Sequence, residues 1–316
     1  MSVTRRVAVV ANPNARENRR WPHRLAELRE RYGERALFLE TKRVEDLGDA
    51  AAEVRAAGVE YLALHGGDGT NHVTLTAFAK AWGDEDFPRI VILRGGTMNT
   101  VSNSFGIRGK PSTILPWLLD ALDLGETPRE VARPLLRVLD GGETRYGFIF
   151  GNGVVSNFLR VYYEQGEVSP LVAAKVFVQV VFSVLVGGSL AKRLSARFEG
   201  SVRKGDATWL EGGFTSVMAS STEQIGLGFT PFRRAGERGD RIHVVAIPGG
   251  LSDIVRALPA VWRGAELPGT GFADDLAASF ELGCSTRFDY TLDGDLYDCA
   301  GSLRLEAGPV VRVVIP

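Results

Sequence analysis

A glycine-rich turn that follows an apolar run limits what this chain can fold into. Residues 59–64 are mostly apolar, with β-branched and aromatic members at the start, which predicts a buried strand. Gly66, Gly67 and Gly69 then end the strand, and residues 71–81 can continue as a helix. A strand that passes through glycines into a helix places backbone N–H groups and a helix N-terminus at one point, which favours binding of a phosphate.

Asp68 is the carboxylate among these glycines, and it leaves two interpretations open. A carboxylate would repel a phosphate unless a divalent cation lies between them, as Mg²⁺ usually does. Alternatively, the turn is a tight connection in which the Asp helps to cap the helix. The turn matches neither G-x-G-x-x-G nor G-x-x-x-x-G-K-[ST], so it does not indicate a dinucleotide fold or a P-loop.

Length and composition predict a globular protein of two domains. The chain has 316 residues, of which 45% are hydrophobic and 24% charged. A net charge of −1 provides no overall attraction to nucleic acid, so no nucleic-acid partner is expected. Cys284 and Cys299 fit neither a structural metal site nor a disulfide framework. The first six residues lead into a strand rather than a signal peptide, so we expect a cytoplasmic location.

The first 128 residues alternate predicted strands and helices. We expect a helix at 44–57 and strands at 7–11, 36–40, 59–64 and 89–93. This alternation predicts a three-layer α/β domain with a parallel sheet over residues 1–128. In such sheets ligands bind outside the carboxyl ends of the strands. The residues that follow those ends, and that we expect to meet at one edge, are Asn12, Thr41, Gly66–Thr70 and Gly96–Asn99.

Four arginines follow the first predicted strand closely, namely Arg16, Arg19, Arg20 and Arg24. A solvated helix face is the plain explanation for a run of charges of this kind. Contact of some of these arginines with a phosphate is the alternative, because they follow a strand end of the same sheet edge.

The pattern changes near residue 130 to short strands separated by Gly, Asp and Pro. We expect a hairpin formed by 131–139 and 145–150, followed by strands at 194–203, 213–219, 241–247, 278–282 and 287–292. Such strands predict a β-rich antiparallel sandwich domain over residues 129–306, with 125–131 as the linker. The C-terminal strand, about 307–316, is able to return to the first domain.

Residues 171–191 form a largely apolar segment in which Lys175, Gln179 and Ser183 recur every four residues, as one stripe on a helix. Three interpretations stay open: a transmembrane span, a core helix of the second domain, or an apolar wall that holds an acyl chain or touches a membrane. The basic residues that follow would suit an anionic bilayer, and they are Lys192, Arg193, Arg197, Arg203 and Lys204.

These stretches resemble the diacylglycerol kinase and sphingosine kinase superfamily, especially soluble bacterial lipid kinases, over nearly the whole chain. Residues 66–70 match its G-G-D-G-T motif without a change, and Asn12-Pro13 resembles its opening N-P turn. Thr41 stands where a nucleotide-contacting Thr occurs in the family. Residues 96–99, Gly-Thr-Met-Asn, resemble its G-T-x-N block, and Phe105-Gly106-Ile107 resembles the L-G-I that follows it.

Near the C-terminus, Asp293-Gly294-Asp295 resembles the family's D-G-E, whose first Asp is the proposed general base. The second carboxylate is therefore one methylene shorter here. The chain also departs from the family at Met98, where G-T-G-N has a glycine, and at residues 12–16, where N-P-x-S-G reads Asn-Pro-Asn-Ala-Arg. These departures keep the residues needed for phosphoryl transfer and leave the substrate open.

The resemblance implies a kinase that uses ATP and Mg²⁺ to phosphorylate the primary hydroxyl of a membrane lipid, such as diacylglycerol, ceramide or a sphingoid base. Asp68 would engage Mg²⁺, Asp293 would accept the substrate proton, and Asp295 would help to orient it or the metal. Asp240 is the nearest counterpart of a second metal ligand in the family. The implied nucleotide-binding residues are Asn12, Thr41, Gly66, Gly67, Asp68, Gly69, Thr70, Gly96, Thr97 and Asn99.

Other interpretations stay open beside the resemblance. For Asp293-Gly294-Asp295 the alternative is a plain hairpin turn, since Asp-Gly is a common signal for one. NAD kinases share G-G-D-G-T, but their Asn-Glu pair occurs nowhere in this chain. A non-catalytic lipid- or nucleotide-binding relative is the third alternative. The expected partner is a lipid at the inner face of the membrane, with peripheral membrane contact, and a homodimer is left open.

Overall fold

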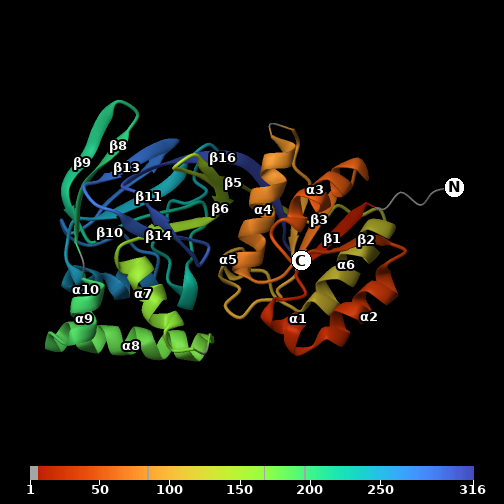
Figure 1. Cartoon of the computed structure of the whole chain (residues 1–316), viewed down its shortest axis with the longest axis horizontal. Coiled ribbons are helices and arrows are strands. Elements are labelled where there is room, and N and C mark those ends of the chain that lie inside the picture. The colour runs from red at the N-terminus through yellow and green to blue at the C-terminus, as the bar shows by residue number, and fades with distance from the viewer. Residues whose placement is uncertain (1–5, 84, 167, 196) are drawn as a thin grey trace. The chain divides into compact units, whose positions relative to one another are not determined.

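The computed structural model describes residues 6–83, 85–166, 168–195 and 197–316 (Figure 1). The predicted start of the chain and residue 196 of the strand predicted at 194–203 lie outside these ranges. The chain divides into two units, residues 1–133 together with 309–316, and residues 134–308. That residues 1–128 bind nucleotide and residues 129–306 bind lipid stays a prediction.

The first unit is built on a parallel sheet with the strand order β2-β1-β3-β4. Every residue of β1 and β3 is buried, as expected for strands covered on both faces. Ala11 lies opposite both Glu40 and His65, and Leu64 lies opposite Ile92, so the carboxyl ends of the four strands meet at one edge. The strands are β1 (Val7–Ala11), β2 (Ala36–Glu40), β3 (Tyr61–His65) and β4 (Arg89–Ile92).

Helices cover both faces of this sheet, with α3 and α4 on one side and α1, α2 and α6 on the other (Figure 1). In α4 the buried residues Leu75, Phe78, Ala79 and Trp82 recur at helical spacing and give the helix an apolar side toward the sheet. The helices of this unit are α1 (Arg16–Arg20), α2 (Pro22–Tyr32), α3 (Asp46–Ala56), α4 (Asp68–Trp82), α5 (Thr100–Ser104) and α6 (Pro111–Asp123). The predicted three-layer α/β domain is confirmed.

The second unit contains a six-stranded antiparallel sheet and the antiparallel part of the ten-stranded sheet whose parallel part is β2-β1-β3-β4. One has the strand order β12 (Ala273–Ala277), β11 (Ile242–Ile247), β10 (Ser216–Ser220), β7 (Ile149–Asn152), β14 (Phe288–Leu292) and β15 (Asp295–Cys299). The other is formed by β6 (Glu143–Gly147), β5 (Glu130–Asp140), β16 (Ser302–Val314), β13 (Ser279–Cys284), β8 (Phe198–Lys204) and β9 (Ala207–Phe214). Strand β16 passes from the second unit back into the first, where Val313 lies opposite Ile90 of β4.

A shared apolar core lies between the two sheets. Phe150 and Tyr290 come from one sheet, with their rings 5.4 Å apart, and Phe214, Phe280 and Leu282 come from the other. All five side chains are almost fully buried in one cluster. Two antiparallel sheets that pack face to face around such a core form a sandwich, so the predicted fold class is confirmed.

Three of the predicted strands are wrong in their extent. The strand predicted at 194–203 begins only at Phe198, because Leu194 is the last residue of a helix. The strand predicted at 145–150 ends at Gly147, because the N–H groups of Phe148 and Ile149 donate to the carboxylate of Asp293, at 3.0 and 2.8 Å, rather than to β5. Residues after that break belong to β7 in the other sheet. The strand predicted at 213–219 is likewise the end of β9 and the whole of β10, which lie in different sheets.

The second unit also contains helices that the sequence pattern did not predict. Helices α7 and α10 were missed because their short apolar stretches also suit strands. The helix predicted over 171–191 is two helices, since Gly187 adopts a left-handed conformation with φ 67° between them. The helices are α7 (Val154–Tyr163), α8 (Pro170–Val186), α9 (Ser189–Leu194), α10 (Leu251–Trp262) and the 3₁₀ turn η1 (Gly226–Gly228).

Helix α8 begins at a well-defined cap, where the Ser169 hydroxyl accepts a hydrogen bond from Val172 N at 3.2 Å and Pro170 occupies the first helical position. Ser183, predicted to share one stripe of the helix with Lys175, is buried and accepts a hydrogen bond from Ala191 N at 2.9 Å. In the ranges given above, no helix has both the length and the apolar character needed to cross a membrane.

Candidate functional site

Two glycine turns of the first unit pack against each other, backbone to backbone. Gly95, after β4, donates its N–H to the carbonyl of Gly66, after β3, at 2.8 Å. A Cβ atom on Gly96 would lie only 2.4 Å from Cα of Gly67. A side chain at position 96 therefore has no room, and a Cβ at position 67 would lie only 3.1 Å from Cα of Gly96.

The N-terminus of α4 opens at this contact. Gly67 is the N-cap, in an extended conformation, and its carbonyl accepts the first intrahelical hydrogen bond from Asn71 N at 2.9 Å. The N–H groups of Asp68, Gly69 and Thr70 therefore lie in the first turn, where a helix provides them with no partner. The helix begins three residues before the predicted Asn71, so the motif forms its positive end and not a loop ahead of it.

The Asp68 carboxylate caps a helix, although not the one predicted. Its two oxygens accept hydrogen bonds from Thr100 N at 2.8 Å and Val101 N at 3.1 Å, at the start of α5. Burial raises the pKa of Asp68, and the hydrogen bonds from Thr100 and Val101 oppose the shift. Each carboxylate oxygen has a further lone pair, so capping of α5 is compatible with contact to a metal ion.

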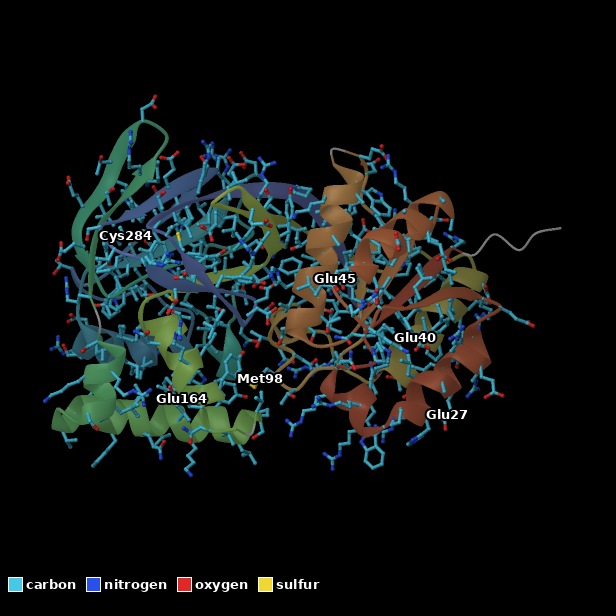
Figure 2. All side chains as sticks on the ribbon, in the orientation of Figure 1. Glu27, Glu40, Glu45, Met98, Glu164 and Cys284 are labelled. Carbon is cyan, nitrogen blue, oxygen red and sulfur yellow. The ribbon has the colours of Figure 1, made fainter. Side chains whose placement is uncertain are left out.

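Two asparagines hold the loops around this edge. Asn99 is left-handed, with φ 50°, and its side chain bonds the backbone of Gly96 twice, at 2.8 and 3.1 Å. Asn12, after β1, donates to the hydroxyl of Thr70 at 3.0 Å. Met98, labelled in Figure 2, is not left-handed, so the loop does not need glycine at that position. Asn12 and Asn99 thus maintain the shape of the edge, and their contact with nucleotide stays a prediction.

Arg16 belongs to this edge, although it was not among the predicted nucleotide-binding residues. Its guanidinium donates to the hydroxyl of Thr97 at 3.3 Å, next to the glycine contact. The sequence singled out the four-arginine run but could not show which member faces the edge. Thr41 lies at the same edge, where its N–H donates to the carbonyl of Ala11 at 2.9 Å and its side chain is buried.

In the second unit, Asp293 forms the turn between β14 and β15. Asp293 and Gly294 both have positive φ, 49° and 98°, and Leu292 pairs with Asp295, so Asp-Gly forms the hairpin turn that the sequence left open as the alternative. The Asp293 carboxylate is buried and accepts hydrogen bonds from Phe148 N and Ile149 N. A Cβ on Gly147 would lie 2.8 Å from it, so glycine leaves room for this carboxylate.

This geometry gives Asp293 a definite structural role, because its carboxylate fixes the break between β6 and β7. Asp295 starts β15 and is half-buried. Tyr163, which the sequence did not indicate, donates from its hydroxyl to the carbonyl of Gly294 at 2.8 Å and so holds the turn from α7. A general-base role for Asp293 and an orienting role for Asp295 stay predictions.

A second polar group lies near this turn. Arg145 stacks 4.5 Å above the ring of Tyr297 and donates to the hydroxyl of Tyr290 at 3.3 Å. Burial raises the pKa of Tyr297 to about 12, with Asp295 and Asp293 adding to the shift. A basic residue inside a strand provides no local signal for this arrangement, so sequence reasoning missed it.

The surroundings of Asp240 provide little for a metal ion. Its exposed carboxylate pairs with Arg238 at 3.1 Å and Arg241 at 3.3 Å, and the hydrogen bond from Arg238 lowers its pKa. Across the part of the chain that the structure describes, no three His, Cys, Asp or Glu side chains cluster as metal ligands. The metal role of Asp240 stays a prediction. At Asp68, Mg²⁺ would take most ligands from phosphates and water.

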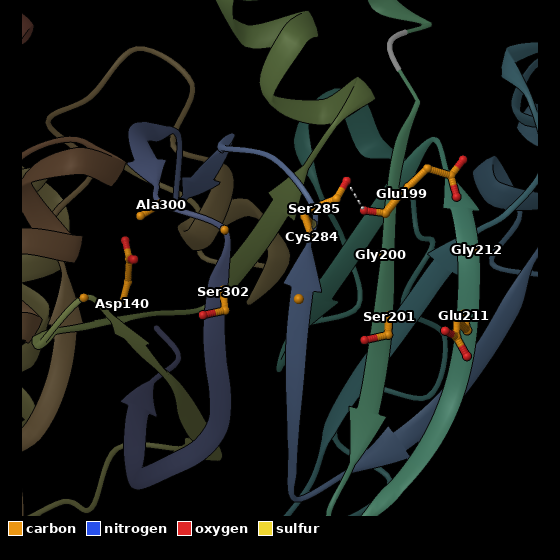
Figure 3. A pocket seen from close by; sticks show the side chains of 13 residues that line it. Asp140, Glu199, Gly200, Ser201, Glu211, Gly212, Cys284, Ser285, Ala300 and Ser302 are labelled. Atoms are coloured by element: carbon orange, nitrogen blue, oxygen red, sulfur yellow. Dashed lines mark hydrogen bonds between the residues drawn. The ribbon is translucent and has the colours of Figure 1, made fainter.

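An open pocket of about 690 Å³ lies elsewhere in the second unit (Figure 3). Asp140, Glu199 and Glu211 give it an acidic lining, and Ser285 donates to the Glu199 carbonyl at 3.3 Å. Its lining includes none of the predicted site residues. A cluster of carboxylates is not by itself a binding site, so the pocket contributes nothing to the assignment.

Comparison with known proteins finds one family model and solved structures of similar fold. Residues 6–127 match the family model of the diacylglycerol kinase catalytic domain. A solved structure described as "A putative diacylglycerol kinase from Bacillus anthracis str. Sterne" is 17% identical, with a TM-score of 0.69 over 99% of this chain and 97% of that one. A second, described as a diacylglycerol kinase from the same organism, is 15% identical, with a TM-score of 0.62 over the same shares. These two show a common fold. No curated protein matches the chain.

The glycine contact predicts a strong effect of one methyl group. Gly96→Ala should lower the free energy of unfolding by about 1–3 kcal/mol, because the new Cβ overlaps the backbone of Gly67. Urea denaturation measures the change. Gly48→Ala is the matched control, since a Cβ there meets nothing within 4 Å on α3, and it should stabilise by roughly 0.5–1 kcal/mol. Equal effects of the two changes would contradict the role of the contact.

His65 predicts a pH dependence of stability. Burial lowers its pKa from 6.5 to about 4, so the unfolded chain binds a proton below pH 6.5 that the folded chain binds only near pH 4. Stability should therefore fall as the pH drops through this window, by about 3 kcal/mol from this group. His65→Gln should flatten that part of the unfolding curve, whereas His23→Gln, at an exposed position, should leave it unchanged. Parallel curves for wild type and His65→Gln would refute the assignment.

Proposed function

We propose that the chain, whose residues 6–127 match the family model of the diacylglycerol kinase catalytic domain, transfers the γ-phosphate of ATP to the primary hydroxyl of a membrane lipid. The observation that carries the proposal is the pair of glycine turns packed together at the N-terminus of α4. Phosphoryl transfer requires little covalent chemistry from a protein, and mainly positioning and neutralisation of phosphate charge. The backbone N–H groups and the positive helix end at that edge would supply both.

The proposed nucleotide site uses groups already held in place. Backbone N–H groups of Asp68, Gly69 and Thr70 would donate to phosphate oxygens, with the positive end of α4 behind them. Arg16 adds a permanent positive charge beside Thr97. Asp68 would hold Mg²⁺, which when bound neutralises phosphate charge. Asn12, Thr41, Gly66, Gly67, Gly96 and Asn99 would complete the site by fixing the shape of these turns.

The proposed acceptor chemistry uses Asp293. Two backbone N–H groups orient its carboxylate, so that a remaining lone pair can accept the proton of an attacking hydroxyl. Asp295 follows two residues later and would help to orient that carboxylate or the metal. Diacylglycerol, ceramide and sphingoid bases all present a primary hydroxyl, so a panel of these lipids with labelled ATP identifies the acceptor. NAD is included in the same panel, because an NAD kinase would phosphorylate NAD and none of the lipids.

A test of the proposed metal role of Asp68 has to separate an effect on turnover from the loss of its cap on α5. Asp68→Asn should lower turnover by more than about 10²-fold, because a metal-held charge is worth several kcal/mol. It should also cost about 1 kcal/mol of stability as the cap on α5 weakens. Asp46→Asn is the matched control, because the Asp46 carboxylate likewise accepts two backbone N–H groups, from Lys42 and Arg43, at the start of α3. Kinase assays and thermal unfolding of both variants are needed.

The control variant should also be destabilised, because its own cap hydrogen bonds weaken, and it should keep its turnover. If Asp68→Asn also kept turnover, the proposed metal role of Asp68 would be wrong, and the carboxylate would serve only as a cap.

Asp293→Asn tests the proposed base. Asparagine keeps one acceptor oxygen for Phe148 N and Ile149 N but cannot take a proton, so kcat should fall by ~10²–10⁴ while the nucleotide Kd is unchanged. Asp289→Asn, on the same hairpin, loses only an ion pair with Arg160 and should keep its kcat. If Asp293→Asn kept a near-wild-type kcat, the proposed general-base role would be wrong. Asp293 would then have only its structural role.

A further inference from the structure

Helix α8 is apolar on both of its sides. On the inner side Val176 and Val180 are buried in a cluster with Val161 of α7 and Leu251 of α10. On the outer side five large apolar side chains are between 62 and 83% exposed, namely Leu171, Val178, Phe182, Leu185 and Val186. We call these five residues the outer stripe. A helix with an apolar solvent side is unusual, because solvent-facing positions are normally polar.

The outer stripe holds almost half of the large exposed apolar side chains within the described residues. Eleven large apolar side chains are exposed there, and five of them belong to this one helix of 17 residues. Leu171, Val178, Phe182 and Leu185 follow one another at intervals of seven, four and three, so they share one face of the helix. Large contiguous apolar surfaces on folded proteins mark interaction sites.

The charges around the stripe indicate what covers it. From residue 168 to residue 198 the chain has Lys175, Lys192, Arg193 and Arg197 and no carboxylate. Lys175 is exposed and lies between Leu171 and Val178 on the outer side. Arg193 pairs with Glu164, labelled in Figure 2, at 2.8 Å. The segment as a whole is apolar and positively charged, which suits an anionic surface with an apolar interior.

We propose that α8 lies on an anionic lipid bilayer, parallel to its surface, with the outer stripe inserted at the level of the headgroups and upper acyl chains. Lys175 can extend along the helix to reach lipid phosphates while its methylene groups stay in the apolar layer. In an interface with a second copy, the same lysine would be removed from water without an anionic partner on this segment. A bilayer therefore fits better than a dimer.

The helix is rigid enough to bind as it stands. Ser183 accepts from Ala191 N at 2.9 Å, and its carbonyl accepts from Gly188 N at 2.8 Å, so α9 folds back against the end of α8. Phe177 packs against Phe229, with ring centroids 5.0 Å apart. A surface that is already formed loses little conformational entropy on binding.

This inference rests on the proposed function, since a kinase has to reach a lipid acceptor in its bilayer. Vesicle binding tests it without ATP and without a measurement of turnover. The full chain is sedimented with vesicles of phosphatidylcholine alone and of phosphatidylcholine mixed with phosphatidylglycerol. We expect binding to the anionic vesicles that weakens as salt is added. Phe182→Ser combined with Leu185→Ser should reduce this binding by about tenfold or more, because two large apolar groups are lost from the inserted face.

The matched control is Leu124→Ser, since Leu124 is also exposed, at 76%, but lies at the end of α6 in the other unit. This variant should bind vesicles like the wild type. Lys175→Gln should reduce the preference for anionic vesicles more than the binding to neutral ones. All of these side chains are exposed, so the variants should keep the wild-type unfolding midpoint.

Unchanged vesicle binding by the Phe182 and Leu185 double variant would overturn the proposal. The proposal would also be overturned if the wild type did not bind vesicles but formed a dimer, and the double variant were monomeric. The outer stripe would then be an interface between two copies of the chain. A chain that binds anionic vesicles through the stripe but phosphorylates no lipid would support this inference and contradict the proposed function instead.

Discussion

The contact between Gly67 and Gly96 is the interaction on which the candidate site depends. It brings the turns after β3 and β4 close enough for Asp68, at the start of α4, to bond the first N–H groups of α5. Asn12 reaches the same turn from β1, and Arg16 reaches Thr97 beside it. Because main chain meets main chain, the edge offers N–H groups of fixed direction instead of flexible side chains, which is the arrangement that anion binding favours.

Most of the first unit could be predicted from local patterns. β1 and β2 begin and end where predicted, because short apolar runs bounded by Asn, Pro and charged residues leave little choice. The start of α4 could not be predicted, since glycine is a poor helix former and local propensity argues against Gly69 in a helix. A tertiary interaction holds this first turn in place, since the Asp68 carboxylate accepts hydrogen bonds from Thr100 N and Val101 N of α5.

In the second unit the limits of local reasoning are clearer. The Asp-Gly pair at 293–294 predicted a hairpin and the structure contains one, because the conformation is decided within the turn itself. The end of β6 at Gly147 is decided by the carboxylate of Asp293, which lies 145 residues away from Phe148 in sequence. No local sequence feature near Phe148 indicates that hydrogen bond. Arg16 is a similar case. The sequence shows that Arg16 belongs to a basic run, but it does not show that the guanidinium reaches Thr97.

Strand β16 has a consequence for the order in which the protein is made. It supplies the neighbour of β4 in the first unit, through Val313 opposite Ile90, although about 220 residues separate the two strands in sequence. At ~5–20 residues per second of synthesis, that distance corresponds to a delay on the order of ten to forty seconds. Throughout that delay the nascent first unit has β4 as an open edge, with unpaired N–H and C=O groups that can join a strand of a neighbouring chain.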